Sequence, residues 1–309
     1  MDRVSTSSAY QAILLNLMST EARQQKIGQQ LSTGQVATDL KGYGGSAETL
    51  TAMQAANTQV SSYYDQTKVV AQKLSVQDQA LQQIAGAGNS ARQAIANVVA
   101  AGDGSTLMQS LESAFKTAIA GINTTYDGQY LFSGGESDTP PTSAKSVSDL
   151  TSAPSIQSLF QNGQFVTSTQ LDSSTSVDTG MLADKIATPL FTALQNIQAY
   201  ANGPNGPFSG PLTAEQTAFL QSQLAPFDTV NQGLTEAAAQ NGVTQKQVDD
   251  AQTNLGQQQT MLAGLLGDTT NADLAKASTD LQQAQLALQA SGQVLLALRS
   301  SSLLNILGG

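Results

Sequence analysis

The chain has 309 residues, of which only 12% are charged and 5% aromatic, and its net charge is −10. It contains no His, Cys or Trp, which excludes His–Cys zinc sites, disulfides, thiol nucleophiles and Ser-His-Asp triads. The negative charge, with only 13 Lys and Arg residues, argues against a nucleic-acid partner. We therefore expect no cofactor and no metal site.

Carboxylates are the remaining groups that could support catalysis or Ca²⁺ binding. Asp249 and Asp250 are adjacent within a helical pattern, so their side chains point apart. The run Glu136-Ser137-Asp138 lacks the spaced oxygen ligands of an EF-hand loop. We therefore predict no catalytic residues and no enzyme activity. A carboxylate enzyme built on Asp172 or Asp178 of the central region is kept as an alternative.

The start of the chain, Met1–Thr6, has no basic region followed by an apolar core and a small-residue cleavage site, so we expect no secretory signal peptide here. No apolar run approaches the roughly 20 residues of a membrane helix. We expect no membrane insertion, and either a soluble protein or export without a cleaved signal.

The positions of the prolines divide the chain. All eight lie between Pro140 and Pro226. Because Pro costs about 3 kcal/mol inside a helix, the proline-free arms, residues 1–139 and 227–309, are predicted to form long helices.

The central region has a different pattern. Ser158-Leu159-Phe160 and Gln164-Phe165-Val166 flank Asn162-Gly163, which predicts a β-hairpin. Residues 188–201 read as a helix. The centre is therefore predicted to be a small β-containing or mixed domain.

Apolar residues of the N-terminal arm recur at the spacing of an amphipathic helix. They are Ile13, Leu14, Leu17, Met18, Ile27 and Leu31. Gly34 stands where such a helix ends. A second helix is predicted from about Ser46 through Ile84, and a third over residues 106–126.

The C-terminal arm has a heptad repeat. Leu274, Leu281, Leu288 and Leu295 recur every seven residues, and Ala277, Ala284 and Ser291 occupy intervening positions. This pattern predicts one coiled-coil helix over residues 270–306. Such a helix needs a partner for its apolar stripe, and the N-terminal arm carries a matching one.

The predicted fold is therefore mainly α, with terminal arms paired as a long coiled coil or helix bundle and a small mixed central domain. We expect three parts. Residues 1–45 with 268–309 form a coiled-coil core, residues 46–135 with 230–267 form a helical bundle, and residues 136–229 form an outward-facing central domain.

The flanks of the C-terminal stripe are polar but uncharged. Gln282, Gln283, Gln285 and Gln289 stand where coiled coils of soluble monomers usually carry Glu and Lys. Such flanks do not repel identical neighbours, which favours side-by-side packing in an assembly. The alternative is a charge-poor surface with no assembly role.

Three stretches resemble the flagellin superfamily. Leu31-Ser32-Thr33-Gly34 is similar to the segment that closes the first flagellin helix, and residues 271–275, with the heptad leucines and the Leu-rich end 302–307, resemble the terminal helix. The run Tyr126–Gly135, followed by Thr139-Pro140-Pro141, resembles the corresponding stretch of the family's hook–filament junction proteins. Within it, the motif residues are Tyr130, Leu131, Phe132, Gly134 and Gly135.

The resemblance implies a structural subunit of the extracellular bacterial flagellum, exported through the flagellar type III channel and placed at the hook–filament junction. Its implied partners are identical subunits, another hook-associated junction protein, flagellin and an export chaperone. We expect the assembly interface to include two sets of residues. They are Ile13, Leu14, Leu17 and Leu31 in the N-terminal arm, and Leu274, Leu281, Leu288 and Leu295 in the C-terminal arm.

Two further alternatives remain open at this point. The first is a flagellin that forms the filament itself, since it would share both arms. The second is a secreted type III translocator or adhesin that inserts amphipathic helices into membranes, which would require a longer apolar stretch than this chain contains.

Overall fold

The computed structural model describes residues 2–307, and it describes the side chains of Ser8 and of residues 11–297. The chain folds into two compact units, Met1–Gln59 with Gln258–Gly309 (unit 1) and Val60–Gln257 (unit 2). The long helices are α1 (Asp2–Thr33), α2 (Ala47–Ala101), α3 (Leu107–Ile122), α5 (Ala183–Asn202), α6 (Ala214–Thr270) and α7 (Leu274–Leu307). The prediction of a mainly α-helical chain with a small mixed central region is confirmed.

Short elements connect these helices. They are the 3-10 helices η1 (Leu40–Ser46) and η2 (Ile156–Leu159), the helix α4 (Asp149–Ser152), and the strands β1 (Thr125–Tyr126), β2 (Gln129–Tyr130), β3 (Ser168–Gln170) and β4 (Ser176–Asp178). The strands form two antiparallel pairs, β1 with β2 and β3 with β4. All four described strands lie within unit 2, and unit 1 contains an isolated β-bridge between Gln35 and Asn271.

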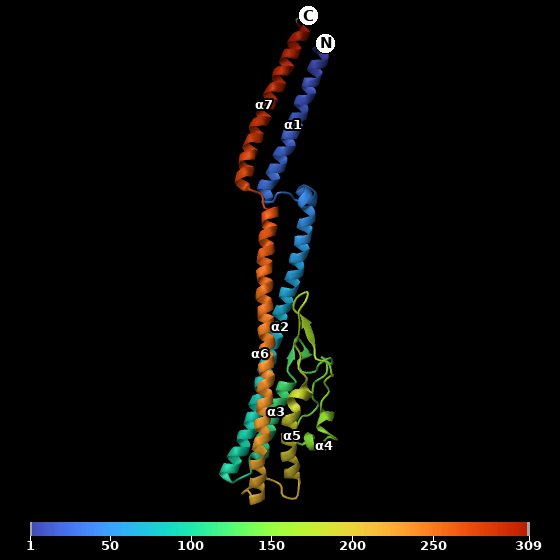
Figure 1. Cartoon of the computed structure of the whole chain (residues 1–309). Coiled ribbons are helices and arrows are strands. Elements are labelled where there is room, and N and C mark those ends of the chain that lie inside the picture. The colour runs from blue at the N-terminus through green and yellow to red at the C-terminus, as the bar shows by residue number, and fades with distance from the viewer. Residues whose placement is uncertain (1, 308–309) are drawn as a thin grey trace. The chain divides into compact units, whose positions relative to one another are not determined.

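In unit 1, α1 and α7 lie side by side and run in opposite directions (Figure 1). Helix α1 ends as predicted, because Gly34 adopts φ +70°, a conformation that glycine accepts without strain. Helix α7 begins after Asp273, whose Oδ1 accepts a hydrogen bond of 3.0 Å from the Lys276 backbone N–H. The single helix predicted over residues 270–306 is therefore observed, starting at Leu274.

The core of unit 2 lies between α2, α3, α5 and α6, together with the segment that follows α3. Its largest side chains, Phe115, Phe132, Phe191 and Phe227, are fully buried. The ring of Phe191 lies 5.2 Å from that of Phe115 and 5.0 Å from that of Phe160. These aromatic contacts hold the central segment against the helices.

A buried polar layer crosses the α2–α6 pair. Gln77 Nε2 donates a 3.0 Å hydrogen bond to Asn241 Oδ1, and Asn241 Nδ2 donates one of 3.0 Å to the Leu74 carbonyl. Gln245 Nε2 donates to the same carbonyl at 3.0 Å. The remaining oxygen, Gln77 Oε1, is buried without a partner. A polar layer of this kind fixes the register of two paired helices.

The hairpin predicted around Asn162-Gly163 is wrong. Residues 156–159 are a 3-10 helix, and the hairpin of this region joins β3 to β4 over residues 168–178. The physical reason is that Asn162 and Gly163 bond to other segments. Asn162 Nδ2 donates to Asp184 Oδ1 at 3.0 Å, and the Gly163 N–H donates to the Ser133 carbonyl at 2.8 Å.

Two helix boundaries also differ from the predictions. The third helix ends at Ile122 rather than near residue 126, because Thr125 and Tyr126 pair with β2. The helical C-terminal arm begins at Ala214 rather than at residue 227, since α6 contains Pro226. Tertiary packing outweighs the local cost of this proline, because the neighbouring Phe227 is fully buried. The helix predicted over residues 188–201 is observed as α5.

Candidate assembly surface

A narrow apolar seam joins α1 to α7 in unit 1. Ile27, Ala277 and Ala284 are each only 5% exposed, and Leu31 and Leu281 pack against them. The two alanines belong to the heptad pattern of the C-terminal arm, and their small side chains allow close approach of the helices. The predicted pairing of the two terminal helices is therefore observed within one chain.

The predicted interface residues divide into two groups. Six are half-buried: Ile13, Leu17, Leu31, Leu281, Leu288 and Leu295. The other two, Leu14 and Leu274, are 41% and 50% exposed. The Leu-rich end over residues 302–307 lies outside the described side chains. Of the heptad positions, Ala277, Leu281 and Ala284 pack in the seam between α1 and α7.

Apolar side chains outside the seam are left in solvent. We call six of them the outer apolar residues: Leu14, Leu15, Met18, Leu286, Val294 and Leu296. Their exposed fractions range from 41% at Leu14 to 66% at Leu15 and Leu286. Only Leu14 of these six is among the interface residues predicted from the sequence. The sequence offered one signal for the others, which is that each places an apolar side chain outside the seam positions of the heptad pattern.

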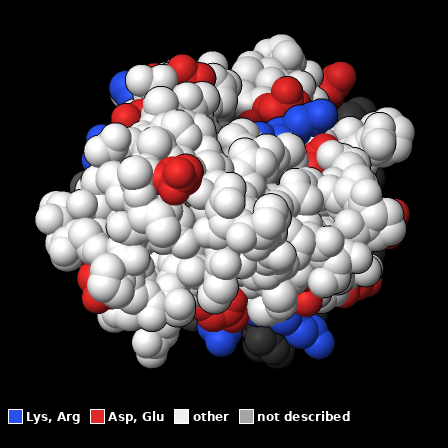
Figure 2. Space-filling view, turned by 90° about the horizontal axis from the view of Figure 1, so that it is seen from below, with Lys and Arg blue, Asp and Glu red and all other residues white. Residues whose placement is uncertain are grey.

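Few charges surround these helices. The flanking residues Gln282, Gln283, Gln285 and Gln289 are exposed, as expected. Uncharged polar side chains can hydrogen-bond to identical neighbours without charge repulsion, so these glutamines suit contact between copies. The low charge is not confined to these helices: Figure 2 shows the molecule from below, at the end of unit 2 where α5 joins α6, and there Lys, Arg, Asp and Glu occupy small, separated areas of an otherwise uncharged surface.

The motif residues of unit 2 have a structural role that the sequence did not reveal. Leu131 and Phe132 are buried in the core, and Tyr130 is half-buried. The Phe132 carbonyl accepts a 2.9 Å hydrogen bond from the Ala183 N–H at the start of α5. The motif therefore ties the end of the N-terminal arm to the first turn of a central helix.

Gly134 makes this connection possible. It adopts φ +62°, and a Cβ at this position would lie 2.7 Å from Leu182 Cδ2 and 2.8 Å from the Phe165 carbonyl oxygen. Both the left-handed conformation and the lack of space require glycine here. Gly135, by contrast, has no neighbouring atom within 4 Å of the corresponding position.

The carboxylates considered for catalysis are bound in structural roles or lie in solvent. Asp172 Oδ1 accepts hydrogen bonds of 2.7 Å from the backbone N–H groups of Ser174 and Thr175 in the β3–β4 turn. These bonds, that of Ser174 first, hold the pKa of Asp172 below its usual value, whereas a general acid at neutral pH needs a raised pKa. Asp178 is exposed on β4, and Asp250 pairs with Lys246 on the surface of α6.

Among the described residues, no helix is long and apolar enough to cross a bilayer. No group of three or more His, Cys, Asp or Glu residues in the same part of the chain is placed to hold a metal ion.

The sequence matches the bacterial flagellin N-terminal helical region over residues 4–137 and the bacterial flagellin C-terminal helical region over residues 224–307. The chain therefore belongs to the bacterial flagellin family and is a flagellar structural protein. The predicted family resemblance is confirmed for both arms, and the matches leave out residues 138–223 of the centre.

Solved structures share this fold. One is a flagellar hook-associated protein from Vibrio parahaemolyticus, with 16% identity and a TM-score of 0.60, covering 75% of this chain and 99% of that one. Another is FlgL from Bacillus cereus, with 14% identity and a TM-score of 0.52, covering 70% of this chain and 97% of that one. No curated protein sequence matches this chain.

Proposed function

We propose that this chain is a non-catalytic structural subunit that joins the hook to the filament of the bacterial flagellum by helical self-assembly. One observation carries the proposal: the terminal helices bury their common apolar seam within one chain and still leave the outer apolar residues in solvent. A monomer gains nothing from such residues, whereas a layer of identical subunits buries them.

Burial of these side chains contributes to the free energy of assembly. Full burial of one Leu, Val or Met side chain contributes about 1.5–3 kcal/mol. Six half- to two-thirds-exposed side chains per subunit therefore offer several kcal/mol before the cost of association. Ile13, Leu17, Leu31, Leu281, Leu288 and Leu295 act by holding the two helices together, and Leu14 and Leu274 contact the neighbouring subunit.

Two observations favour the junction over the filament. Leu131, Phe132 and Gly134 of the motif are buried where the N-terminal arm meets the central region. In addition, the fold is similar to those of a hook-associated protein and of FlgL. In this proposal the subunits form a short extracellular layer between another hook-associated junction protein and flagellin, after type III export with a chaperone. A flagellin of the filament itself is the second candidate.

Gold-labelled antibody on intact flagella tests the location. Label confined to a short zone between hook and filament is the expected result. Label along the whole filament would identify the chain as a filament flagellin, and absence of label from flagella would reject the flagellar role of the mature protein.

A matched pair of variants tests the surface. Leu14→Ser with Met18→Ser, introduced together into a strain lacking the wild-type chain, is expected to reduce filament attachment because two outer apolar residues are lost. Phe165→Ser is the control, since Phe165 is 81% exposed but lies in the central region. Equal attachment in both strains would refute the assigned surface, provided that both proteins are exported in equal amounts.

A further inference from the structure

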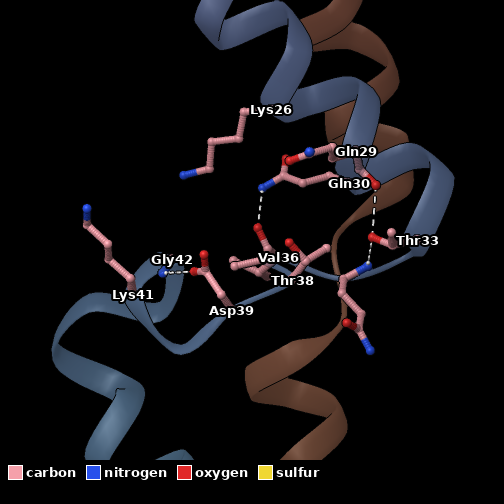
Figure 3. Close-up of a pocket in the computed structure, with 11 residues that line it drawn as sticks. Lys26, Gln29, Gln30, Thr33, Val36, Thr38, Asp39, Lys41 and Gly42 are labelled. Atoms are coloured by element: carbon pink, nitrogen blue, oxygen red, sulfur yellow. Dashed lines mark hydrogen bonds between the residues drawn. The ribbon is translucent and has the colours of Figure 1, made fainter.

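A polar pocket lies in unit 1, where the end of α1 meets the loop that leads to η1 (Figure 3). It has a volume of about 360 Å³, at the lower end of the range of ligand sites. The last turns of α1 contribute Lys26, Gln29, Gln30 and Thr33, and the loop and the start of η1 contribute residues 35–39, Lys41 and Gly42.

Hydrogen bonds hold the walls of this pocket in place. Gln30 Nε2 donates to the Val36 carbonyl at 2.9 Å, and the Val36 N–H donates to the Thr270 carbonyl at 2.8 Å. The Tyr43 hydroxyl donates to the Ala37 carbonyl at 2.8 Å. The loop is therefore fixed from both sides, and a ligand would meet a pre-organised site.

The pocket carries excess positive charge in a strongly acidic chain. Figure 3 shows Lys26 and Lys41 extending along the same side of the pocket. Neither lysine has a carboxylate within 4.0 Å among the described residues, whereas Lys68, Lys116, Lys185 and Lys246 each do. Asp39 is the only acid among the described residues that line the pocket, and its Oδ1 accepts a hydrogen bond from the Gly42 N–H at 2.8 Å.

We propose that this pocket binds a carboxylate side chain of a second copy of the chain, with Lys26 and Lys41 as its two cationic contacts. The proposal rests on the self-assembly proposed above. Charge complementarity identifies the occupant, because a chain of net charge −10 presents an excess of carboxylates to its neighbours. Unit 1 itself offers Glu21, Glu48 and Asp268, which are exposed and have no ion pair among the described residues.

Zero-length cross-linking tests this directly. A water-soluble carbodiimide couples a carboxylate to a lysine amine only where the two groups are in contact. The full chain is prepared in ¹⁴N and ¹⁵N forms, mixed, allowed to self-associate, cross-linked and analysed by mass spectrometry. A peptide that joins a ¹⁴N to a ¹⁵N segment comes from two different copies. The pair Lys116–Glu112, 3.2 Å apart in α3, is the internal control for a link within one copy.

The expected result is a mixed-label link from Lys26 or Lys41 to an Asp or Glu of another copy. If the copies associate and the control pair is linked, but neither lysine gives a mixed-label product, the inference is overturned while the assembly role stands. A link from these lysines only to their own chain overturns it too. If the copies do not associate at all, the proposed self-assembly fails first and the inference fails with it.

A second measurement uses neutral variants. Lys26→Gln with Lys41→Gln is expected to raise the protein concentration needed for self-association about two- to tenfold, as for the loss of one or two exposed ion pairs. Lys116→Gln with Lys246→Gln removes the same number of charges from exposed lysines outside the pocket, and this matched control should leave that concentration unchanged. An equal effect of both changes would show that overall charge, rather than this pocket, governs association and would overturn the inference.

Discussion

The buried polar layer between α2 and α6 predicts both the sign and the size of the change in the free energy of unfolding when its side chains are replaced. Replacing Asn241 with Ala removes the acceptor of Gln77 Nε2, so both polar atoms of the Gln77 side chain are then buried without a partner. The Leu74 carbonyl keeps its bond from Gln245. Unsatisfied buried groups cost about 1–3 kcal/mol, and the space left by the amide adds to this. We therefore expect Asn241→Ala to lower the free energy of unfolding by about 2–4 kcal/mol.

The double variant Gln77→Leu with Asn241→Leu should behave differently. It leaves no buried polar atom of this pair unsatisfied, and apolar replacement of both partners is often nearly neutral or stabilising. We expect its free energy of unfolding to lie within about 1 kcal/mol of wild type.

Urea denaturation of the full-length chain, followed by circular dichroism at 222 nm, measures these free energies. Gln247→Ala, at an exposed position of the same helix, is the control and should change stability by no more than about 0.5 kcal/mol. The reasoning would be refuted if Asn241→Ala cost less than the control, or if the double variant lowered the free energy of unfolding as much as Asn241→Ala does.

Three further predictions follow from single contacts. Gly134→Ala should lower the free energy of unfolding of unit 2 by about 1–3 kcal/mol, and with it the melting temperature, because of the positive φ and the close neighbours of the added Cβ. Gly135→Ala is the control and should have little effect. Equal melting temperatures of the two variants would contradict this. Ile27→Ala, at a 5% exposed position, should lower the free energy of unfolding by about 2–4 kcal/mol and speed amide hydrogen exchange in α1. Leu15→Ala, at an exposed position of the same helix, should do neither. The pKa of Asp149 is lowered first by the hydrogen bond from the Lys145 N–H, so this carboxylate stabilises the fold above its unfolded pKa of about 3.9. Asp149→Ala should therefore destabilise the chain at pH 7, and the difference should disappear as the pH falls through the folded pKa; a constant difference down to pH 2 would exclude this cause.

The helical arms could be predicted because their signals are local. Gly34 ends α1 through its own backbone conformation, and the heptad leucines and alanines of α7 are neighbours on one face of the same helix. The division of the chain into three parts remains a prediction.

The predictions failed where a residue's partner is distant in the sequence. Asn162 bonds to Asp184 instead of closing a hairpin. Pro226 lies inside α6 because its neighbour Phe227 fills the core of unit 2.

The amino-acid sequence by itself determined that this protein is built on two long terminal helices with matching apolar stripes and a charge-poor surface, because helical periodicity and composition are properties of neighbouring residues. Only the tertiary structure decided which apolar residues are buried in the α1–α7 seam and which stay in solvent, since that depends on the register of two helices from opposite ends of the chain. It also brought Lys26 and Lys41 to one pocket, because the loop between them is held by the backbone of Thr270.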